Sequence, residues 1–390
     1  MKLKALLIGY DLGNIQVMTH LLARAQFEVD VITTSRAVQI HMQHLQKLGQ
    51  LHFIEHETNF WQTLKTIKTA SFALKIVVDD GFLHTILNSA LAEDLKLALL
   101  PVVSIRHFSH LCSKVGLAQV FFENGINAPK FRVAQNRELA EKLASELHFP
   151  ILIKVDFSCA GNGIFECQTK EDLIRHLQQE LVYPLLLQEK ISGQELDLSA
   201  FYQEGQLIYF GYAKIKQVAG RFGPSLLREY LHASYIPKSV VQELHAIGQA
   251  LGANGFVTIS CMQSFDGGRR DYFEADMRPN VWADTTQYIG LDAALAIKKW
   301  FTVRQSMTDQ IALETYFPRQ KIIPMVFRMG WWAILFNFHQ AWQFPFAGES
   351  TSKYLLFRAK KNIDLVLARV IANIKNISNF CMNNPARYKL

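Results

Sequence analysis

The start of the chain alternates strand and helix patterns, and this alternation limits the folds open to it more than any other feature. The sequence reads KALLIGY, then DLGN, then the helical pattern IQVMTHLLARA, and a second strand pattern, FEVDVIT, follows. A later strand pattern, ALKIVVDD, ends in two carboxylates. Strand, glycine turn, helix and strand in this order predict the start of a doubly wound α/β domain.

The turn after the first strand leaves two interpretations open. Gly9 and Gly13 would let the backbone run close to a ligand at the carboxyl end of that strand. They do not complete the G-x-G-x-x-G pattern of dinucleotide sites, so a dinucleotide oxidoreductase is weakly supported. A plain tight turn and a small-ligand site remain equal alternatives.

Composition excludes several classes of protein. The 390 residues suggest two or three domains, and an apolar fraction of 49% is enough for a large core. The formal charge is +7, and residues 349–390 hold eight Lys or Arg against two acids, which we interpret as a solvated basic helix rather than a nucleic-acid site. The cysteines form no C-x-x-C pair and are odd in number, which predicts reduced thiols, a cytoplasmic location and no zinc site: Cys112, Cys159, Cys167, Cys261 and Cys381.

No segment of the sequence predicts stable membrane insertion. The N-terminus reads as a strand rather than as a signal peptide. The most apolar stretch, MGWWAILFNFHQAWQF, is interrupted by Asn337 and His339 and falls short of the roughly 18–20 apolar residues that a spanning helix needs. The pattern RAKKNIDLVLARVIANIK predicts an amphipathic C-terminal helix, and a peripheral membrane contact through it is one alternative.

The middle of the chain gathers residues suited to anions. The segment ILIKVDFSCAGNGIF places Lys154 at the end of a strand before a loop of small residues, whose backbone N–H groups can approach phosphate oxygens. An ordinary hairpin turn explains the same residues equally well. A helix before it, SHLCSKVGLAQVFFENG, holds Lys114, and LLLQEKISGQELD ends a buried strand in a polar turn.

A later strand, DYFEADMR, carries Glu274, Asp276 and Arg278 at every second position. Side chains alternate along a strand, so these three point to one face. Charges on one face are costly to bury unpaired, but two carboxylates suit Mg²⁺ and an arginine suits phosphate. A surface ladder of ion pairs is the structural alternative.

These segments, in their order and spacing, resemble the ATP-grasp superfamily, especially its carboxylate–amine or carboxylate–thiol ligases. The resemblance covers roughly residues 109–290 and rests on four matches: SK…NGINAPKF, FPILIKVDFSCAGNGI, LLLQEKISGQELDLSAF and FEADMRP. It implies an α/β chain with a Rossmann-like N-terminal domain at 1–105, ATP-grasp subdomains at 106–187 and 188–310, and a mixed or helical region at 311–390.

The resemblance implies ATP and Mg²⁺ as cofactors and assigns roles by position. Lys114 and Lys154 would contact the phosphates, Lys214 would be a further phosphate contact, and Glu195 would hold the ribose. Glu274 and Asp276 would bind Mg²⁺. Arg278 would touch the phosphates or the acyl-phosphate oxygen, which makes Arg278 and Lys154 the catalytic candidates. The loop over the phosphates would be formed by Ser158, Ala160, Gly161, Asn162 and Gly163, and the adenine would be lined by Gln188, Glu189, Lys190 and Ile191.

The implied activity is an ADP-forming ligase that acts on a small-molecule carboxylate and an amine, or less readily a thiol. Arg221 and Arg228 are candidates for a substrate carboxylate, with surface arginines as the alternative. Cys159 is interpreted as a bystander, and His107 and His110 as surface residues. The sequence leaves a homodimer open.

Three positions depart from the family pattern. Asp276 stands where the family usually has Asn, and Val155 where it has Pro. Ser260, in GFVTISCM, stands near the place of the other metal-binding carboxylate. This last departure supports the alternative of a nucleotide-binding pseudoenzyme or regulatory module with weak turnover.

Overall fold

The computed structural model describes residues 3–36, 38–39, 49–54, 57–66, 71–158, 161–218, 220–304 and 320–324. All described residues belong to one compact unit, Met1–Met325, and residues 326–390 lie outside the description. The predicted helical character of 311–390, including the amphipathic pattern and Cys381, therefore falls outside the description except for residues 320–324. The predicted domain boundaries stay a prediction.

The N-terminal sheet is parallel and confirms the predicted doubly wound start. Its strands run in the order β3-β2-β1-β4: Leu51–Phe53, Phe27–Thr33, Leu3–Ile8 and Leu74–Val77. The helices around it are α1 (Leu12–Arg24), α3 (Glu57–Thr66), α4 (Asp80–Asn88) and α5 (Glu93–Leu99). The last four residues of β1 are fully buried, as expected for a strand covered on both faces. Asp11 caps α1 by accepting a hydrogen bond from the Asn14 amide at 2.7 Å.

A second sheet is small and antiparallel. Its order is β5-β8-β6-β7: Phe131–Ala134, Leu185–Glu189, Ile151–Val155 and Ile164–Cys167. Helices α7 (Arg137–Leu143) and α8 (Lys170–Leu177) supply Ala140 and Leu173 to a core shared with the strand residues Ile151, Ile153 and Leu187. The short helix η4 (Ala144–Glu146) follows α7.

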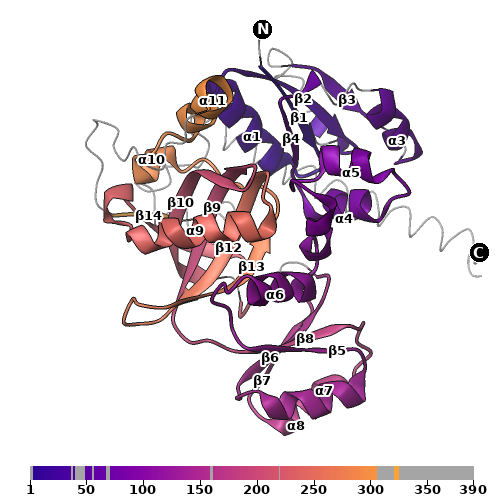
Figure 1. The fold of residues 1–390 in the computed structure, drawn as a ribbon, viewed down its shortest axis with the longest axis vertical. Helices are drawn as coiled ribbons and strands as arrows, with labels where there is room; N and C mark the ends of the chain where they lie inside the picture. The colour runs from indigo at the N-terminus through magenta and orange to yellow at the C-terminus, as the bar shows by residue number, and fades with distance from the viewer. Residues whose placement is uncertain are drawn as a thin grey trace, which may run out of the picture. The chain divides into compact units, whose positions relative to one another are not determined.

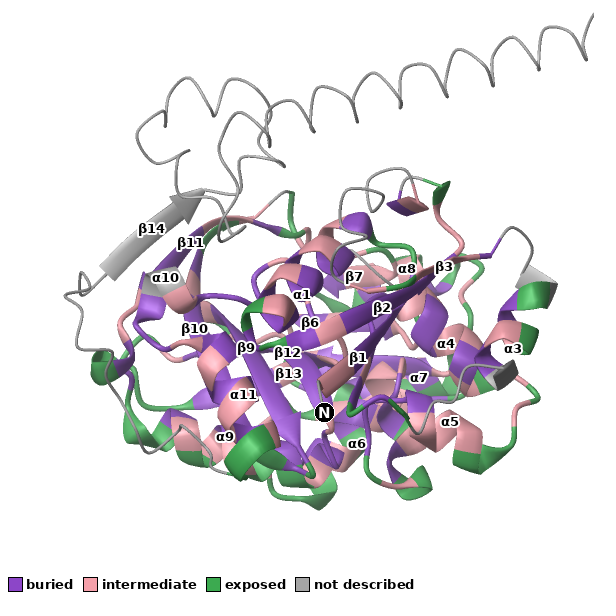
Figure 2. Ribbon diagram, turned by 90° about the horizontal axis from the view of Figure 1, so that it is seen from above, coloured by how far each residue is buried: buried purple, intermediate pink, exposed green. Residues whose placement is uncertain are grey.

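The third sheet is larger. Its order is β13-β12-β9-β10-β11-β14: Arg270–Asp276, Gly255–Gln263, Gln194–Gln203, Gln206–Val218, Ser225–Leu231 and Gln320–Pro324. Helix α9 (Lys238–Leu251) follows the short helix η5 (Ala233–Tyr235) and buries Val240, Leu244 and Ile247. The Tyr202 hydroxyl on β9 donates a hydrogen bond to the Leu244 carbonyl at 2.9 Å. Figure 2 shows the strands mainly buried and the exposed residues mostly on the surrounding helices and loops.

The chain returns to the N-terminal sheet after β13. Helices α10 (Thr286–Ile289) and α11 (Ala293–Val303) follow, and Figure 1 shows α11 beside α1. Phe301 packs edge-on against Phe27, with ring centroids 5.2 Å apart. Arg24 of α1 pairs with Asp292 at 3.0 Å and also with Asp284. These contacts fix the N-terminal sheet to the segment that follows the charged strand.

Two sequence interpretations need correction. The helix predicted from Ser109 begins only at Lys114, as α6 (Lys114–Glu123), because Ser113 caps it by accepting the Gly116 amide at 2.8 Å. The preceding residues form the 3₁₀ helix η3 (Ile105–His110). His107 and His110 were expected at the surface, yet both are buried, and burial lowers the pKa of His110 to about 4.

The described cysteines Cys112, Cys167 and Cys261 are free thiols, as predicted, and Cys159 is not described. Within the described ranges, no helix is long and apolar enough to cross a bilayer.

Candidate functional site

Six of the predicted site residues line one cavity of about 140 Å³. Helix α6 lies between the small sheet and the larger one, as Figure 1 shows, so that its first turn, the end of β6 and the end of β13 meet. The residues brought together are Lys114, Lys154, Ser158, Glu274, Asp276 and Arg278. We call Lys114 and Lys154 the cationic wall, and Glu274 and Asp276 the acidic wall.

Lys114 is positioned by an aspartate that sequence reasoning missed. Asp156, just after β6, accepts hydrogen bonds from the Val115 amide at 2.8 Å and from the Ser113 hydroxyl at 2.9 Å. A carboxylate at this place satisfies the unpaired amides of a helix N-terminus and suits the helix dipole. The Lys114 ammonium donates to the Ser158 carbonyl at 2.9 Å and to its hydroxyl at 3.1 Å. Asp156 thus ties the start of α6 to the end of β6, with Lys114 at the junction.

Lys154 is the buried member of the cationic wall. It is 5% exposed, and its ammonium lies 5.3 Å from the centre of the Phe273 ring. Burial lowers the pKa of Lys154 to about 8, and the nearby Glu274 carboxylate partly opposes this effect. An ammonium held out of water in this way gains more from an arriving anion than a hydrated surface lysine would.

The acidic wall follows from the register of β13. Glu274 lies opposite Ser260 of β12, and Asp276 lies opposite Thr258. Glu274 is exposed and has no hydrogen bond or ion pair among the described residues. Burial and the neighbouring Glu274 raise the pKa of Asp276 well above its usual range, while Arg278 opposes the rise. A cation placed here would relieve the repulsion between the two carboxylates.

Arg278 connects the acidic wall to the N-terminal sheet. Its Nη2 donates to Asp276 Oδ2 at 3.1 Å, and its Nε donates to Asp80 Oδ1 at 2.6 Å. Asp80 is the first residue of α4 and also lines the cavity. The sequence showed that a strand ends in two carboxylates, but nothing in it placed Asp80 beside a residue 198 positions later.

The residues can hold part of a magnesium site. Two carboxylates are the hard oxygen ligands that Mg²⁺ prefers, and Mg²⁺ commonly takes its remaining ligands from phosphates and water. Among the described residues no group of three His, Cys, Asp or Glu side chains could hold a metal. Ser260 stands between Glu274 on one neighbouring strand and Asp197 on the other, which accounts for the missing third carboxylate.

Glu195 lies on β9, the strand next to the one that carries Ser260, and near the carboxylates of Asp197 and Glu274. Burial raises the pKa of Glu195 to about 7, with contributions from Asp197 and Glu274. Arg228 was a candidate for a substrate carboxylate or a surface arginine, and it is buried. It donates to Asp197 Oδ2 at 2.7 Å and lies 4.8 Å above the Trp282 ring. The Arg228–Asp197 pair is therefore an internal ion pair.

The predicted adenine residues lie at the end of β8 and in the connection that follows it, outside this cavity. Gln188 is buried, and Glu189 accepts from the His148 amide at 2.9 Å. Lys190 pairs with Glu166 at 3.0 Å. Glu189 and Ile191 line a separate cavity of about 650 Å³.

The third predicted phosphate lysine and the other candidate for the substrate carboxylate lie away from this cavity. Lys214 is opposite Leu196 in the sheet, whereas Asp197 is opposite Ala213, so Lys214 is on the face away from Glu274. Arg221, the other substrate candidate, pairs with Glu166 at 2.7 Å.

The predicted phosphate loop is described only in part. Cys159 and Ala160 lie outside the described residues, and Asn162 is exposed. Gly161 and Gly163 have φ of +78° and +73°, which favours glycine. A Cβ on Gly161 would lie 2.4 Å from the Phe222 carbonyl oxygen, so this loop packs closely on the segment before β11.

The N-terminal turn has a structural explanation. Gly9 has φ of +151°, and a Cβ there would lie 2.3 Å from Asp79 Oδ2. Asp79 caps α4 through the Phe82 amide at 2.9 Å and accepts the Tyr10 amide at 2.8 Å. Close packing of Asp79 therefore accounts for Gly9 without a ligand.

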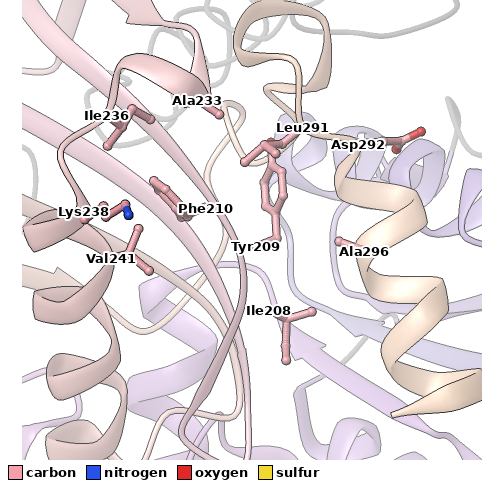
Figure 3. A pocket seen from close by; sticks show the side chains of 10 residues that line it. All are labelled: Ile208, Tyr209, Phe210, Ala233, Ile236, Lys238, Val241, Leu291, Asp292 and Ala296. Atoms are coloured by element: carbon pink, nitrogen blue, oxygen red, sulfur yellow. The ribbon is translucent and has the colours of Figure 1, made fainter. Parts of the chain in front are cut away.

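A separate pocket of about 40 Å³ is lined mainly by apolar side chains and shares no residue with the charged cavity (Figure 3). It lies between β10, the segment leading into α9, and α11, with Tyr209, Phe210 and Leu291 among its walls. Its volume and apolar lining do not suit a nucleotide.

The arrangement of the three sheets and the charged cavity between them is that of the ATP-grasp fold. Residues 112–206 match the model of the RimK-like ATP-grasp domain. Among curated proteins, the arginine-specific large chain of carbamoyl phosphate synthase from Bacillus subtilis is 29% identical over 82 residues. That stretch is 20% of this chain and 8% of the relative, so the chain spans a small part of that protein.

Solved structures with the same fold cover most of the chain. N5-carboxyaminoimidazole synthetase from Staphylococcus aureus, complexed with ADP, matches with a TM-score of 0.64 at 13% identity, over 90% of this chain and 91% of that one. The biotin carboxylase domain of 2-oxoglutarate carboxylase from Hydrogenobacter thermophilus, complexed with MgADP and bicarbonate, matches at 0.57 and 13%, over 83% and 74%. L-amino acid ligase from Bacillus licheniformis matches at 0.54 and 15%, over 77% and 75%.

Proposed function

We propose that the protein is an ATP-dependent, ADP-forming ligase that activates a small-molecule carboxylate as an acyl phosphate for attack by an amine, or less readily a thiol. The observation that carries the proposal is the meeting of the cationic and acidic walls in one cavity, with Arg278 at its edge. ATP-grasp ligases similar in fold have been solved with ADP and with MgADP, which supports ATP and Mg²⁺ as the cofactors.

Glu274 and Asp276 would hold Mg²⁺, which supplies positive charge that neutralises the phosphates when bound. Lys114 and Lys154, which line the same cavity, would bind the phosphates of ATP. In the reaction, an oxygen of the carboxylate attacks the γ-phosphorus, and the bond to ADP breaks. The amine nitrogen then attacks the carbonyl carbon, phosphate leaves, and the nitrogen loses a proton.

The chain's own residues act by position and charge. Phosphoryl transfer needs alignment of the attacking and leaving oxygens and stabilisation of charge on the equatorial oxygens. Lys154 is suited to this because its ammonium is fixed and poorly hydrated. Arg278 would contact the transferred phosphoryl group after release from its carboxylate partners Asp80 and Asp276.

A second candidate function is nucleotide binding with weak or no turnover. Ser260 favours it, because a serine stands in the strand position between Glu274 and Asp197 where a further carboxylate would complete a metal site. The two candidates share the nucleotide site and differ only in chemistry.

One experiment in two stages separates them. ATP is titrated calorimetrically into the protein with and without Mg²⁺, and ADP release is then measured against a panel of carboxylates paired with amines or thiols. Magnesium-dependent binding with acceptor-dependent ADP release supports the ligase. Binding without release for any pair supports the second candidate, and no binding contradicts both.

A further inference from the structure

Asp80 is a charged residue of the cavity that the proposed function does not use. It lies on α4, beside the N-terminal sheet, whereas the other charged residues of the cavity lie at the start of α6 and on or just after β6 and β13. Its side chain is 30% exposed and that of Arg278 is 19% exposed, so both reach the cavity while being partly shielded from water. The Asp80–Arg278 pair is therefore stronger than a surface ion pair.

Neighbouring hydrogen bonds fix the backbone at both residues of this pair. Asp79 takes over the capping of α4 and leaves the Asp80 carboxylate free to point away from the helix. The Arg278 amide donates to the Asp276 carbonyl at 2.8 Å, and its own carbonyl accepts the Thr258 hydroxyl at 3.3 Å. The pair thus has little freedom to separate through backbone movement alone.

The guanidinium of Arg278 is already occupied on all three nitrogens. Nε donates to Asp80, Nη2 to Asp276 and Nη1 to the Pro279 carbonyl at 3.3 Å. A phosphate oxygen approaching Arg278 must share this group with the Asp80 carboxylate or displace it. Two anions on one guanidinium repel each other, so the nucleotide and Asp80 oppose one another.

From this geometry we infer that Asp80 is a placeholder for a phosphate oxygen on Arg278, released when nucleotide binds. The inference rests on the proposed nucleotide site and adds a specific energetic link between that site and the N-terminal domain. Asp80 then lowers nucleotide affinity, because binding must break its pair with Arg278. The released carboxylate remains at the cavity edge, where it favours a cationic partner over an anionic one.

The test compares MgATP affinity in the wild type, Asp80→Asn and Asp80→Ala by calorimetry. Both variants should bind MgATP about three- to tenfold more tightly than the wild type, the scale of one charge-assisted hydrogen bond in a partly exposed site. Asp94→Asn is the matched control, because Asp94 is also an acid in the first turn of a helix but is exposed on α5. It should leave the affinity unchanged.

A double-mutant cycle shows whether Asp80 acts through Arg278. In an Arg278→Gln background, Asp80→Asn should no longer tighten MgATP binding, because the guanidinium for which Asp80 and the phosphate compete is absent. Circular dichroism and thermal unfolding of each variant confirm that it is folded.

Unchanged or weaker binding by folded Asp80→Asn and Asp80→Ala proteins overturns the inference, and so does tightening that persists without Arg278. If the wild type binds no MgATP, the proposed function fails instead, so the two failures are distinguishable.

Discussion

The two walls of the cavity carry opposite charges and are supported in opposite ways. Lys114 donates hydrogen bonds to Ser158, and Lys154 is buried with its ammonium over the Phe273 ring. Glu274, in contrast, is exposed and has no hydrogen bond or ion pair among the described residues. The cationic wall is thus preformed by internal contacts, whereas the acidic wall retains a carboxylate whose partner must come from outside. This asymmetry fits a cation that arrives with its nucleotide.

The largest expected effect comes from the acidic wall. Glu274→Gln keeps the shape of the side chain and removes its charge, so it should abolish the magnesium dependence of ATP binding and lower turnover at least about 100-fold. Thermal unfolding should barely change, because the side chain is exposed. Calorimetry with and without Mg²⁺ measures the first effect, and Asp266→Asn, in the exposed turn before β13, is the control. A variant that keeps its magnesium dependence would remove Glu274 from the metal site.

A substitution in the cationic wall should change nucleotide affinity and folding stability in opposite directions. Lys154→Met should weaken MgATP binding about tenfold or more and yet stabilise the folded protein by on the order of 1–3 kcal/mol at neutral pH, because burying the charge is costly. The pKa of Lys154 is about 8 in the folded protein, below its ordinary value of 10.5. Between these values the unfolded chain binds more protons, so wild-type stability should rise with pH across this window.

Nucleotide affinity should show the opposite trend. As pH rises through about 8, Lys154 loses its proton in the free protein and attracts phosphate less. Denaturant unfolding and calorimetry at pH 7 and pH 9 test both trends, and Lys154→Met should flatten both. If Lys154→Met is less stable than the wild type at neutral pH, burial of the charged Lys154 ammonium does not destabilise the folded protein.

Much of this arrangement could be predicted from the sequence where local pattern decides it. Glu274, Asp276 and Arg278 stand at every second position of a strand pattern, which predicts that their side chains lie on one face of the sheet. The order of strand, turn and helix predicts the N-terminal sheet. Lys214 shows the limit of this reasoning, because the face it occupies depends on register with Leu196 rather than on its own segment. Lys190 is likewise occupied by Glu166, a partner that no local pattern names.

The contacts that the sequence did not reveal join distant segments. Asp156 accepts the Val115 amide in the first turn of a helix that begins 42 positions earlier, at Lys114, and Asp80 on α4 pairs with Arg278 after β13. Such contacts depend on how three sheets pack together. The buried positions of His107 and His110 have the same origin, since the His110 ring lies 3.0 Å from the Leu251 carbonyl on α9.

A smaller effect should follow from the loss of the Asp156 contacts that support the cationic wall. Asp156→Asn should cost about 1–2 kcal/mol of unfolding free energy and weaken nucleotide binding a few-fold, because the start of α6 and Lys114 lose their anchor. Asn136→Ala is the matched control, since Asn136 caps α7 through the Leu139 amide at 2.9 Å. It should cost similar stability without changing nucleotide affinity. Equal losses of affinity in both variants would mean that Asp156 has no special role at the site.

The smallest effect concerns the position that departs from the family pattern. Ser260→Asp places a carboxylate beside Glu274 and should strengthen Mn²⁺ binding in the presence of ADP about two- to tenfold, because it adds a hard ligand to an incomplete set. Electron paramagnetic resonance of free Mn²⁺ measures this directly, and Thr258→Ser in the same strand controls for disturbance of the sheet. Weaker Mn²⁺ binding in a folded Ser260→Asp protein would place the cation away from Ser260.

The proposed function requires that one nucleotide with its metal lies between the cationic and acidic walls. The most direct measurement is a crystal structure of the protein with ADP and Mn²⁺, in which anomalous scattering locates the metal. We expect a manganese peak within about 2.5 Å of carboxylate oxygens of Glu274 and Asp276, with the phosphates between the metal and the ammonium groups of Lys114 and Lys154. A nucleotide bound elsewhere, or a metal that contacts neither carboxylate, would contradict it.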